Sequence, residues 1–357
     1  MRALLTVHPA LSHVRAMVPV AHALLRAGHV VAVATPASIH GEVGAYGLEP
    51  VAAGAHWSDA EVAGVQGVLR RTGQPWRWAH LFLRELADPD RMADDVVALA
   101  PNWRPDAIVH DCSELGGGRA ARRLGLPCVA VGTVAGGAGV LEPAGPAGRL
   151  RASMLPPEFE PDDPDVRRYR PEPALRPDDR LPGWVAELPA GRPLVVVSLG
   201  TVFHGVPGRL EALLAGLAGV ECAAVVAAGD PGRLPPQPPH IRVEARIPQA
   251  LLLECCDLLV THGGANSVRE ALSLGVPMVL APIASDQVHL AGRCEALGIG
   301  RSLGEGDVEP AAAAAACREV LGDPAYRERA RAVMRTVLAL PPLDRLVSDL
   351  ESLVGGE

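Results

Sequence analysis

Short apolar runs followed by stretches with helical periodicity recur along this whole chain, and no other pattern in it restricts the fold as strongly. Runs of this length, bounded by turn residues, are typical of strands buried on both faces of a parallel sheet. The helical stretches between them complete βαβ units, so we predict an α/β protein with doubly wound parallel sheets. The runs lie at residues 3–7, 30–34, 107–110, 127–131, 194–198, 222–228, 257–260 and 278–281.

The first βα unit shows the pattern most clearly. Strands are expected at residues 3–7 and 30–34, with a helix between them. Gly28 is expected just after the helix C-cap, because glycine adopts the left-handed backbone conformation without strain. Pro19 predicts a kink or a later helix start, because proline has no N–H to donate. The apolar face of the helix is formed by Val14, Met17, Val18, Ala21, Leu24 and Leu25.

The 357 residues allow two domains at roughly 150 residues each. Prolines accumulate between about 141 and 192, and this stretch is predicted as surface loop and linker. We expect an N-terminal domain over 1–188, a C-terminal domain over 189–340, and an amphipathic helix over 341–357 that packs back on the first domain. The two Rossmann-like domains are expected to face a cleft, with ligands beyond the carboxyl ends of the strands.

Composition removes several classes of function. All 33 cationic residues are arginines, which excludes Gly-Lys-Ser/Thr phosphate loops, pyridoxal Schiff bases and lysine nucleophiles. A net charge of −8, with only 5 Trp, 3 Tyr and 3 Phe, provides no basic stripe for nucleic acid. The seven cysteines form no C-x-x-C pair and no His cluster has metal-ligand spacing, so we expect buried thiols and no metal site. Without a signal peptide or a run of 18 apolar residues, a cytoplasmic protein with no membrane span is expected.

The loop at residues 261–267 follows a predicted strand and precedes a helix. Its two glycines let a ligand approach the backbone, and the helix N-terminus attracts an anion through its N–H groups and dipole. This arrangement predicts a diphosphate site. A capping box formed by Ser267 and Glu270 would satisfy the same helix end without a ligand, so both interpretations stay open. The residues assigned to the diphosphate are His262, Gly263, Gly264, Asn266 and Ser267.

A second polar pair, Asp286 and Gln287, follows the strand expected at 278–281. A carboxylate that accepts hydrogen bonds next to an amide that donates and accepts them suits the recognition of sugar hydroxyls. Asp286 also fits the N-cap of the helix running to Ala296. Taken singly, the N-cap interpretation is preferred.

Several segments in the same order resemble the GT-B glycosyltransferases that use nucleotide-activated sugars, and more narrowly the family-1 enzymes that glycosylate natural products. The N-terminal segments are similar to those of actinomycete macrolide and aromatic-polyketide glycosyltransferases. The resemblance therefore spans nearly the whole chain. The matching segments are residues 12–19, 28–29, 198–203, 248–249, 262–272, 275–277, 282 and 286–287.

The resemblance implies a base and an orienting carboxylate in the first domain. His13 matches the family's general base, which takes the proton from the acceptor hydroxyl. Asp111 matches the carboxylate that orients this histidine and stabilises the imidazolium. His13 also lies near a helix N-terminus, whose dipole keeps the imidazole neutral near pH 7. His8 and His110 are the rival bases.

The resemblance also implies the donor site of the second domain. His262, Asn266 and Ser267 would hold the diphosphate, Glu270 the ribose, and the pair at 286–287 the sugar. Where relatives carry a tryptophan that stacks on the base, this chain has an arginine, whose guanidinium can also stack on a planar ring. The complete set of donor residues is Thr201, Arg246, Gln249, His262, Gly263, Gly264, Asn266, Ser267, Glu270, Asp286 and Gln287.

The acceptor pocket is expected in the loops between 54 and 103. Trp57, Trp76, Trp78 and Phe82 are candidates to line it, and core positions are an equal alternative for these aromatic side chains.

The function implied is that of an inverting, metal-independent glycosyltransferase. It would move a sugar, with a deoxysugar among the options, from a TDP- or UDP-donor to a small natural-product aglycone. The nucleotide sugar is a co-substrate and no other cofactor is expected; a homodimer is left open. One alternative is a non-catalytic GT-B protein that binds a nucleotide sugar for another transferase. The presence of His13 and Asp111 is evidence against this alternative. The other is a nicotinamide-dependent enzyme, but no Gly-x-Gly-x-x-Gly follows the first strand.

Overall fold

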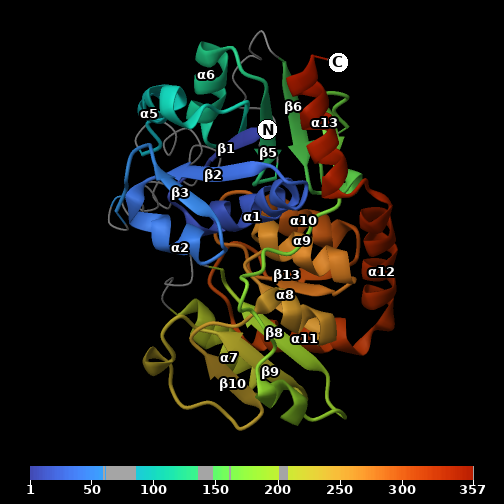
Figure 1. Cartoon of the computed structure of the whole chain (residues 1–357). Coiled ribbons are helices and arrows are strands. Elements are labelled where there is room, and N and C mark those ends of the chain that lie inside the picture. Colours follow the sequence, from blue (N-terminus) through green and yellow to red (C-terminus); the bar gives the residue numbers. More distant parts are fainter. Residues whose placement is uncertain (59–60, 62–85, 136–147, 161, 201–207, 357) are drawn as a thin grey trace. The chain divides into compact units, whose positions relative to one another are not determined.

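The computed structural model divides the chain into two compact units, one formed by Met1–Pro177 with Leu340–Glu357 and the other by Asp178–Ala339 (Figure 1). Each unit is built on its own parallel sheet. The structure describes all residues except 59–60, 62–85, 136–147, 161, 201–207 and 357.

The first unit contains a seven-stranded sheet with the order β3-β2-β1-β4-β5-β6-β7. Every paired neighbour runs parallel. The chain leaves β1 toward one side of the sheet and β4 toward the other, and ligands bind beyond the carboxyl ends of the strands at such a switch point. The strands are β1 (Arg2–Thr6), β2 (Val30–Thr35), β3 (Glu49–Ala52), β4 (Ala107–Asp111), β5 (Cys128–Gly132), β6 (Arg149–Ser153) and β7 (Val166–Arg168).

Successive side chains of β1 point into two different parts of the core. Leu4 packs with apolar residues of α5 (Pro89–Trp103) and α6 (Leu115–Leu124). Ala3 and Leu5 pack with those of α1 (Leu11–Arg26) and α13 (Leu343–Gly355). Burial on both faces explains why the strand reads as a continuous apolar run. The shorter helices of this unit are η1 (Ala37–Ile39), α2 (His40–Gly44) and η3 (Pro157–Phe159).

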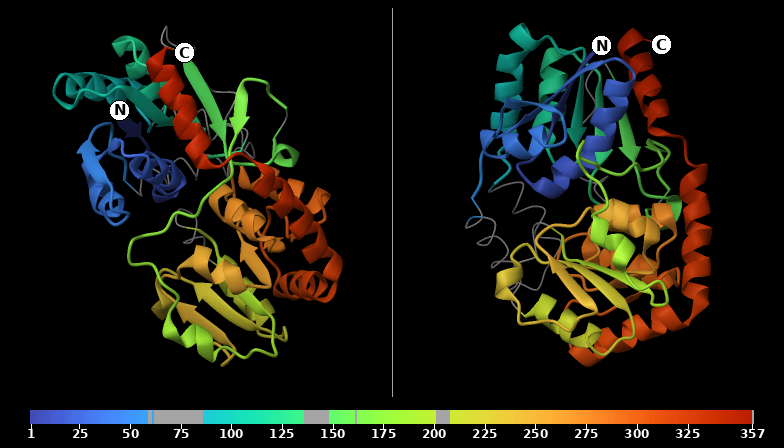
Figure 2. Two further views of the ribbon diagram at one scale, coloured as in Figure 1. Left: turned by 45° about the vertical axis from the view of Figure 1, so that its right-hand side comes forward. Right: turned by 60° about the horizontal axis from the view of Figure 1, so that its bottom comes forward.

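The last helix, α13, belongs to the first unit although it follows the second in the sequence. Figure 2 shows α13 in red beside β6, and it also contacts α1. Its apolar residues Leu343, Leu346 and Leu350 are fully buried. Asp349 of this helix accepts a 2.6 Å hydrogen bond from the buried Tyr169 hydroxyl. Apolar burial and a buried hydrogen bond therefore fix this helix on the first sheet.

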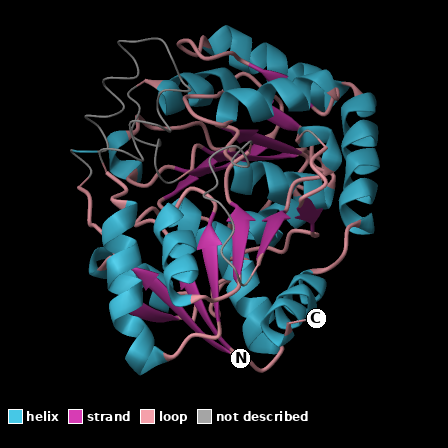
Figure 3. Cartoon of the chain, turned by 90° about the horizontal axis from the view of Figure 1, so that it is seen from above, coloured by secondary structure: helices cyan, strands magenta, loops and turns pink. Residues whose placement is uncertain are grey.

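The second unit contains a six-stranded parallel sheet with the order β10-β9-β8-β11-β12-β13, in which the switch point lies between β8 and β11. Helices flank the sheet, as Figure 3 shows in cyan. Its strands are β8 (Leu194–Ser198), β9 (Ala223–Ala227), β10 (Ile241–Glu244), β11 (Leu258–Thr261), β12 (Met278–Leu280) and β13 (Gly300–Ser302). Its helices are η4 (Gly183–Glu187), α7 (Arg209–Leu217), η5 (Pro231–Arg233), α8 (Gln249–Leu252), η6 (Leu253–Cys255), α9 (Ala265–Leu274), α10 (Gln287–Ala296), α11 (Pro310–Gly322) and α12 (Pro324–Ala339).

The predicted fold class, two doubly wound parallel sheets, is confirmed. Gly28 follows the C-cap of α1 with φ +82°, as expected for a glycine that ends a helix. The alternative of a helix starting near Pro19 is wrong, because α1 begins at Leu11 and continues through the proline.

The expectation of loop throughout 141–192 needs correction. β6 and β7 lie in this stretch and extend the first sheet beyond β5. In β6 the buried Leu150 and Ala152 alternate with arginines. Two buried apolar positions between prolines are too few to register as a period, so pairing with β5 decides the structure here.

All seven cysteines are unpaired, and six of them are buried as expected. Cys255, in η6, is exposed instead. No helix in the described part of the chain is long and apolar enough to cross a membrane. The same residues contain no group of three or more His, Cys, Asp or Glu side chains that could hold a metal ion.

Candidate active site

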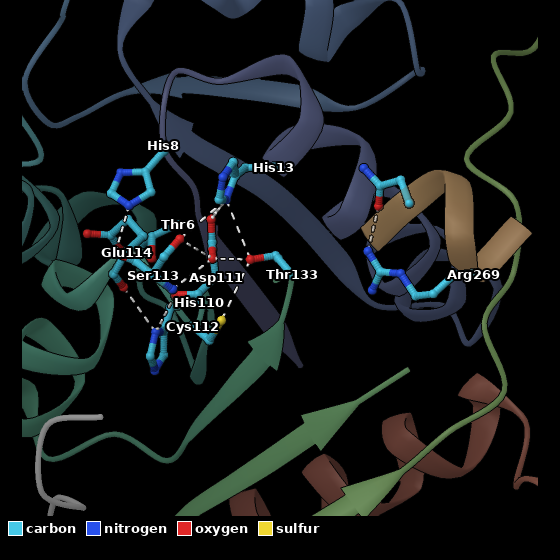
Figure 4. A network of polar contacts seen from close by, with 11 residues as sticks. Thr6, His8, His13, His110, Asp111, Cys112, Ser113, Glu114, Thr133 and Arg269 are labelled. Atoms are coloured by element: carbon cyan, nitrogen blue, oxygen red, sulfur yellow. Dashed lines mark hydrogen bonds and ion pairs between the residues drawn. The ribbon is translucent and has the colours of Figure 1, made fainter. Parts of the chain in front are cut away.

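The switch point of the first sheet brings His13 and Asp111 together. His13 is the third residue of α1, which follows β1, and Asp111 is the last residue of the neighbouring β4. The Nδ1 atom of His13 lies 2.5 Å from the Oδ2 atom of Asp111 (Figure 4). Two residues separated by nearly one hundred positions thus form a histidine–carboxylate pair.

The second carboxylate oxygen of Asp111 accepts three further hydrogen bonds. Its Oδ1 accepts from the Ser113 amide at 2.9 Å, the Ser113 hydroxyl at 2.9 Å and the Thr133 hydroxyl at 2.5 Å. Burial alone would raise the pKa of Asp111, but the nearby His13 imidazole, its hydrogen bond and the Thr133 hydroxyl outweigh burial and hold the pKa well below its usual range. The ionised carboxylate therefore accepts the Nδ1 proton of His13, which makes Nε2 the basic nitrogen.

His8, one of the rival bases, has a different environment. Its Nε2–H donates to the Ser113 carbonyl oxygen at 2.7 Å. Burial lowers the pKa of His8 to about 4, so the ring stays neutral at pH 7. Its ring packs edge-on against His13, with 5.6 Å between ring centroids, and lies 5.3 Å from the ring of Trp57. His8 therefore supports the His13 ring by packing.

His110, the other rival, is also buried, and burial lowers its pKa. Its Nδ1–H donates to the carbonyl oxygens of Asp111 and Glu114, each at 3.0 Å. In the described part of the chain His13 is bonded to a carboxylate and has a side chain that is 13% exposed, whereas His8 and His110 are buried and donate to backbone carbonyls. The geometry therefore favours His13 as the base.

The glycine run at 116–118 serves packing and capping at the start of α6. The Glu114 carboxylate accepts from the amides of Gly116 at 2.7 Å and Gly117 at 2.8 Å, and from the Thr6 hydroxyl at 2.5 Å. A Cβ at Gly117 would lie 2.1 Å from Thr6 Oγ1. Burial raises the pKa of Glu114 to about 7 despite these hydrogen bonds. A buried carboxylate occupies the helix end that a dinucleotide phosphate would need.

The second sheet places the glycine loop at its own switch point, between the end of β11 at Thr261 and the start of α9 at Ala265. The His262 ring lies against glycine on two sides. A Cβ added to Gly200 would lie 2.5 Å from the His262 ring, and one added to Gly264 would lie 2.6 Å from it. The loop can therefore approach β8 this closely only with glycine at both positions.

His262 is a neutral hydrogen-bonding group. Only 9% of the residue is exposed, and burial lowers its pKa to about 4 although a hydrogen bond to the Ser198 backbone acts in the opposite direction. A neutral imidazole can donate one N–H to an anion but adds no positive charge. An anion at this loop would therefore be bound by backbone N–H groups and the helix dipole.

The capping-box interpretation of Ser267 and Glu270 is wrong. The N-cap of α9 is Gly264, so Ser267 lies inside the helix. Both side chains instead accept hydrogen bonds from the Gln249 amide, at 3.2 Å for Ser267 Oγ and 2.7 Å for Glu270 Oε2. Three predicted donor residues from α8 and α9 are thereby brought together.

Asn266 is oriented by Arg269, a buried arginine that the sequence analysis did not single out (Figure 4). Arg269 Nη2 donates to Asn266 Oδ1 at 2.5 Å. A guanidinium can only donate hydrogen bonds, so the side-chain atom of Asn266 that faces Arg269 must be the oxygen. The NH₂ group of Asn266 then points away from Arg269.

Asp286 and Gln287 lie at the start of α10, after β12. Asp286 is the N-cap residue of α10, as predicted, although its φ and ψ of −67° and −14° are helical and its side chain makes no capping hydrogen bond. The buried Gln287 side chain accepts from the backbone amides of Ile283 at 2.8 Å and Ala284 at 3.1 Å. Its oxygen therefore shapes the loop that precedes it.

Arg246 pairs with an acidic residue of its own unit. Its Nη2 lies 2.8 Å from Asp179 Oδ1, and its side chain is half-exposed. Trp57 is buried at 8% exposed. The remaining predicted residues Thr201, Trp76, Trp78 and Phe82 lie outside the described residues.

Comparison with known proteins decides the family. Residues 211–353 match the model described as "Erythromycin biosynthesis protein CIII-like, C-terminal domain". The L-demethylnoviosyl transferase of Streptomyces niveus is 31% identical over 363 residues, covering 93% of this chain and 92% of that protein. The chain belongs to the natural-product glycosyltransferases. The family resemblance predicted from sequence is confirmed, and this glycosyltransferase is nucleotide-sugar dependent.

Solved structures of the family agree with the fold of this glycosyltransferase. SnogD from Streptomyces nogalater is 29% identical, with a TM-score of 0.81 and 99% of each chain covered. VinC, solved in complex with DTDP, is 23% identical with a TM-score of 0.82 and 100% of each chain covered. Both sheets of the chain therefore form a GT-B fold.

Sequence reasoning missed the residues that hold the assigned ones in place. Ser113 and Thr133 bind Asp111, and Arg269 binds Asn266. Thr133 directly follows β5, the strand beside β4, so it lies at the same carboxyl edge as Asp111. The position of Thr133 beside Asp111 can be inferred only once the strand order is known.

Proposed function

We propose that this glycosyltransferase transfers a sugar with inversion, without a metal ion, from a TDP- or UDP-sugar to a small natural-product aglycone. The observation that carries the proposal is the hydrogen bond between His13 and the buried, ionised Asp111. It supports a histidine whose Nε2 is held as a proton acceptor.

The reaction is a single displacement. His13 Nε2 takes the proton of the acceptor hydroxyl as that oxygen bonds to the anomeric carbon, and the bond from that carbon to the diphosphate oxygen breaks. The proton ends on His13, where Asp111 stabilises the imidazolium. Attack opposite the leaving group inverts the anomeric centre.

The leaving diphosphate carries negative charge that must be stabilised. The amide groups and dipole at the start of α9, with donation from neutral His262, support this role without a cation. The structure of VinC with DTDP supports a nucleoside diphosphate as the ligand type. Asp286 and the NH₂ group of Gln287 are the proposed contacts to the sugar.

A ligand titration tests the proposal. We expect TDP or UDP to raise the thermal unfolding temperature and NAD to leave it unchanged, because a ligand that binds only the folded state stabilises it by about 2.7 kcal/mol at 100 times its Kd. A shift with NAD alone would contradict the proposal. Binding of the nucleotide sugar without transfer to any aglycone in a mass-based screen would favour the non-catalytic alternative.

Stereochemistry and metal dependence need their own measurements. We expect the anomeric proton coupling of the product to show inversion, and activity to persist after dialysis against EDTA. A product that retains the donor's configuration, or a loss of activity that Mg²⁺ restores, would contradict those parts of the proposal.

A further inference from the structure

A buried arginine outside the assigned site binds the beginning of the loop after β12. Arg209 is the first residue of α7 and is 7% exposed. Its Nη1 donates to the carbonyl oxygens of Ala281 at 3.0 Å and Pro282 at 3.1 Å. Its Nη2 donates to those of Gly306 at 2.7 Å and Glu305 at 3.4 Å. One guanidinium thus joins the loop after β12 to the loop after β13.

The same loop has a second anchor at its other end. The Gln287 side-chain oxygen accepts from the amides of Ile283 and Ala284, at 2.8 and 3.1 Å. Between the two anchors Ser285 has φ +62°, the left-handed conformation that a non-glycine residue adopts at an energetic cost. Such a conformation persists where the surroundings over-determine it, and these two anchors supply that constraint.

We propose that Arg209 is a positioning residue that determines sugar specificity. By binding the carbonyl groups of Ala281 and Pro282 it sets the path of residues 283–286, and therefore which sugar hydroxyls Asp286 meets. The inference rests on the proposed role of Asp286 and Gln287 in sugar binding. In this arrangement the two ends of the Gln287 side-chain amide have different roles: the oxygen binds the loop backbone and the NH₂ group binds the sugar.

Only an arginine suits this position. The planar guanidinium directs separate N–H groups at two pairs of carbonyl oxygens, whereas a lysine ammonium is a compact point charge that cannot reach both pairs. Arg209→Lys therefore keeps the charge and removes the bridge. Arg209→Met removes both.

The test compares these variants with a matched control, Arg318→Met. Arg318 is an arginine of α11 whose exposed guanidinium donates to one carbonyl, that of Gly219, at 2.8 Å. The assays are kcat and KM for two donors that share a nucleotide and differ at one sugar hydroxyl, and the calorimetric Kd of TDP, or of UDP if the wild type binds that.

We expect kcat/KM for the nucleotide sugars to fall about 10- to 100-fold in both Arg209 variants, which is the effect of a misplacement of about 1 Å. The ratio between the two donors should change, while the Kd of TDP stays within about threefold because the sugar loop does not bind the diphosphate. The control should match the wild type in all three measurements.

An equal loss of TDP affinity and donor kcat/KM, or an unchanged ratio between the donors, would overturn the inference. If Arg209→Met fails to fold by circular dichroism, Arg209→Lys decides, because it retains the buried charge. If the wild type binds TDP and transfers sugar but the Arg209 variants do not behave as expected, the inference about Arg209 is wrong and the proposed function stands. A wild type that neither binds nor transfers refutes the proposed function, and the inference with it.

Discussion

In an Asp111→Asn variant, the existing hydrogen bonds decide which way the new amide points. Three donors from Ser113 and Thr133 surround the position of Oδ1, and only an oxygen can accept them. The amide NH₂ must then take the position of Oδ2 and face His13 Nδ1. Because NH₂ only donates, Nδ1 has to lose its proton, and the proton moves to Nε2. The imidazole is then held in the tautomer with a protonated Nε2, which cannot take the proton from the hydroxyl of the acceptor substrate.

The size of the effect follows from the role of the base. A general base contributes typically about 10² to 10⁴ in rate, so kcat should fall by about that factor, or about 3–5 kcal/mol in the activation barrier. The donor KM and the Kd of the nucleoside diphosphate should stay the same, because neither is proposed to depend on His13. Adding His13→Ala to Asp111→Asn should cost little more than the larger single loss, since the two residues act as a unit.

The assay is the initial rate of nucleoside diphosphate release at saturating donor and acceptor. Asp94→Asn is the matched control, because Asp94 is an exposed carboxylate that pairs with Arg123 between α5 and α6. Exposed pairs contribute about 0–1 kcal/mol to stability, so this variant should keep the wild-type rate. A rate for Asp111→Asn within tenfold of the wild type would refute the tautomer argument.

Three further predictions concern single sites. His13→Ala should lose transfer by about 10² to 10⁴ while keeping the affinity for TDP or UDP by calorimetry, and full activity would mean that the base is misassigned. Gly200→Ala should lower the unfolding free energy by about 1–3 kcal/mol and weaken nucleotide binding, because residue 200 has φ +76° and its new Cβ would lie 2.5 Å from the His262 ring. Gly183→Ala is the control, because a Cβ at that position would have no atom within 4 Å. Equal stability of the two variants would contradict the packing argument. Burial raises the pKa of Glu114 from 4.5 to about 7, so the folded state holds a proton that the unfolded state has lost, and the contribution of Glu114 to stability should fall by on the order of 3 kcal/mol as pH rises through this window. Urea unfolding at pH 4.5 and 7.5 should show that the stability of the wild type relative to Glu114→Gln falls by this amount, since the buried His8 and His262 contribute an opposite slope to both proteins; an unchanged difference between the two proteins would contradict it.

The segments that the sequence predicted best are those whose periodicity is local. The strand at 194–198 was predicted at its observed bounds, and the last helix was recognised from its apolar face. β6 was missed because its alternation is short and its arginines break the apolar run. The capping box at Ser267 and Glu270 was wrong because a spacing cannot show that α9 already begins at Ala265 and that Gln249 binds both side chains.

For the site, residue types and their order were enough to predict a diphosphate site in the loop at 261–267, whereas His13 and Asp111 were assigned from the family resemblance. The choice of His13 over His8 rested on resemblance, and the geometry now supports it through hydrogen bonds. His8 donates to a carbonyl, whereas His13 is bonded to a carboxylate. Such partners are not encoded in the spacing between residues.

By itself the sequence determined that the chain forms two doubly wound sheets and to which family it belongs, because apolar periodicity and ordered motifs are local properties of the chain. Tertiary structure alone decided that Thr133 lies against Asp111, that Arg209 binds the loop before Asp286, and that glycines 200 and 264 enclose the His262 ring. These contacts join segments far apart in the sequence, and they form only when strand order and helix packing bring the segments together.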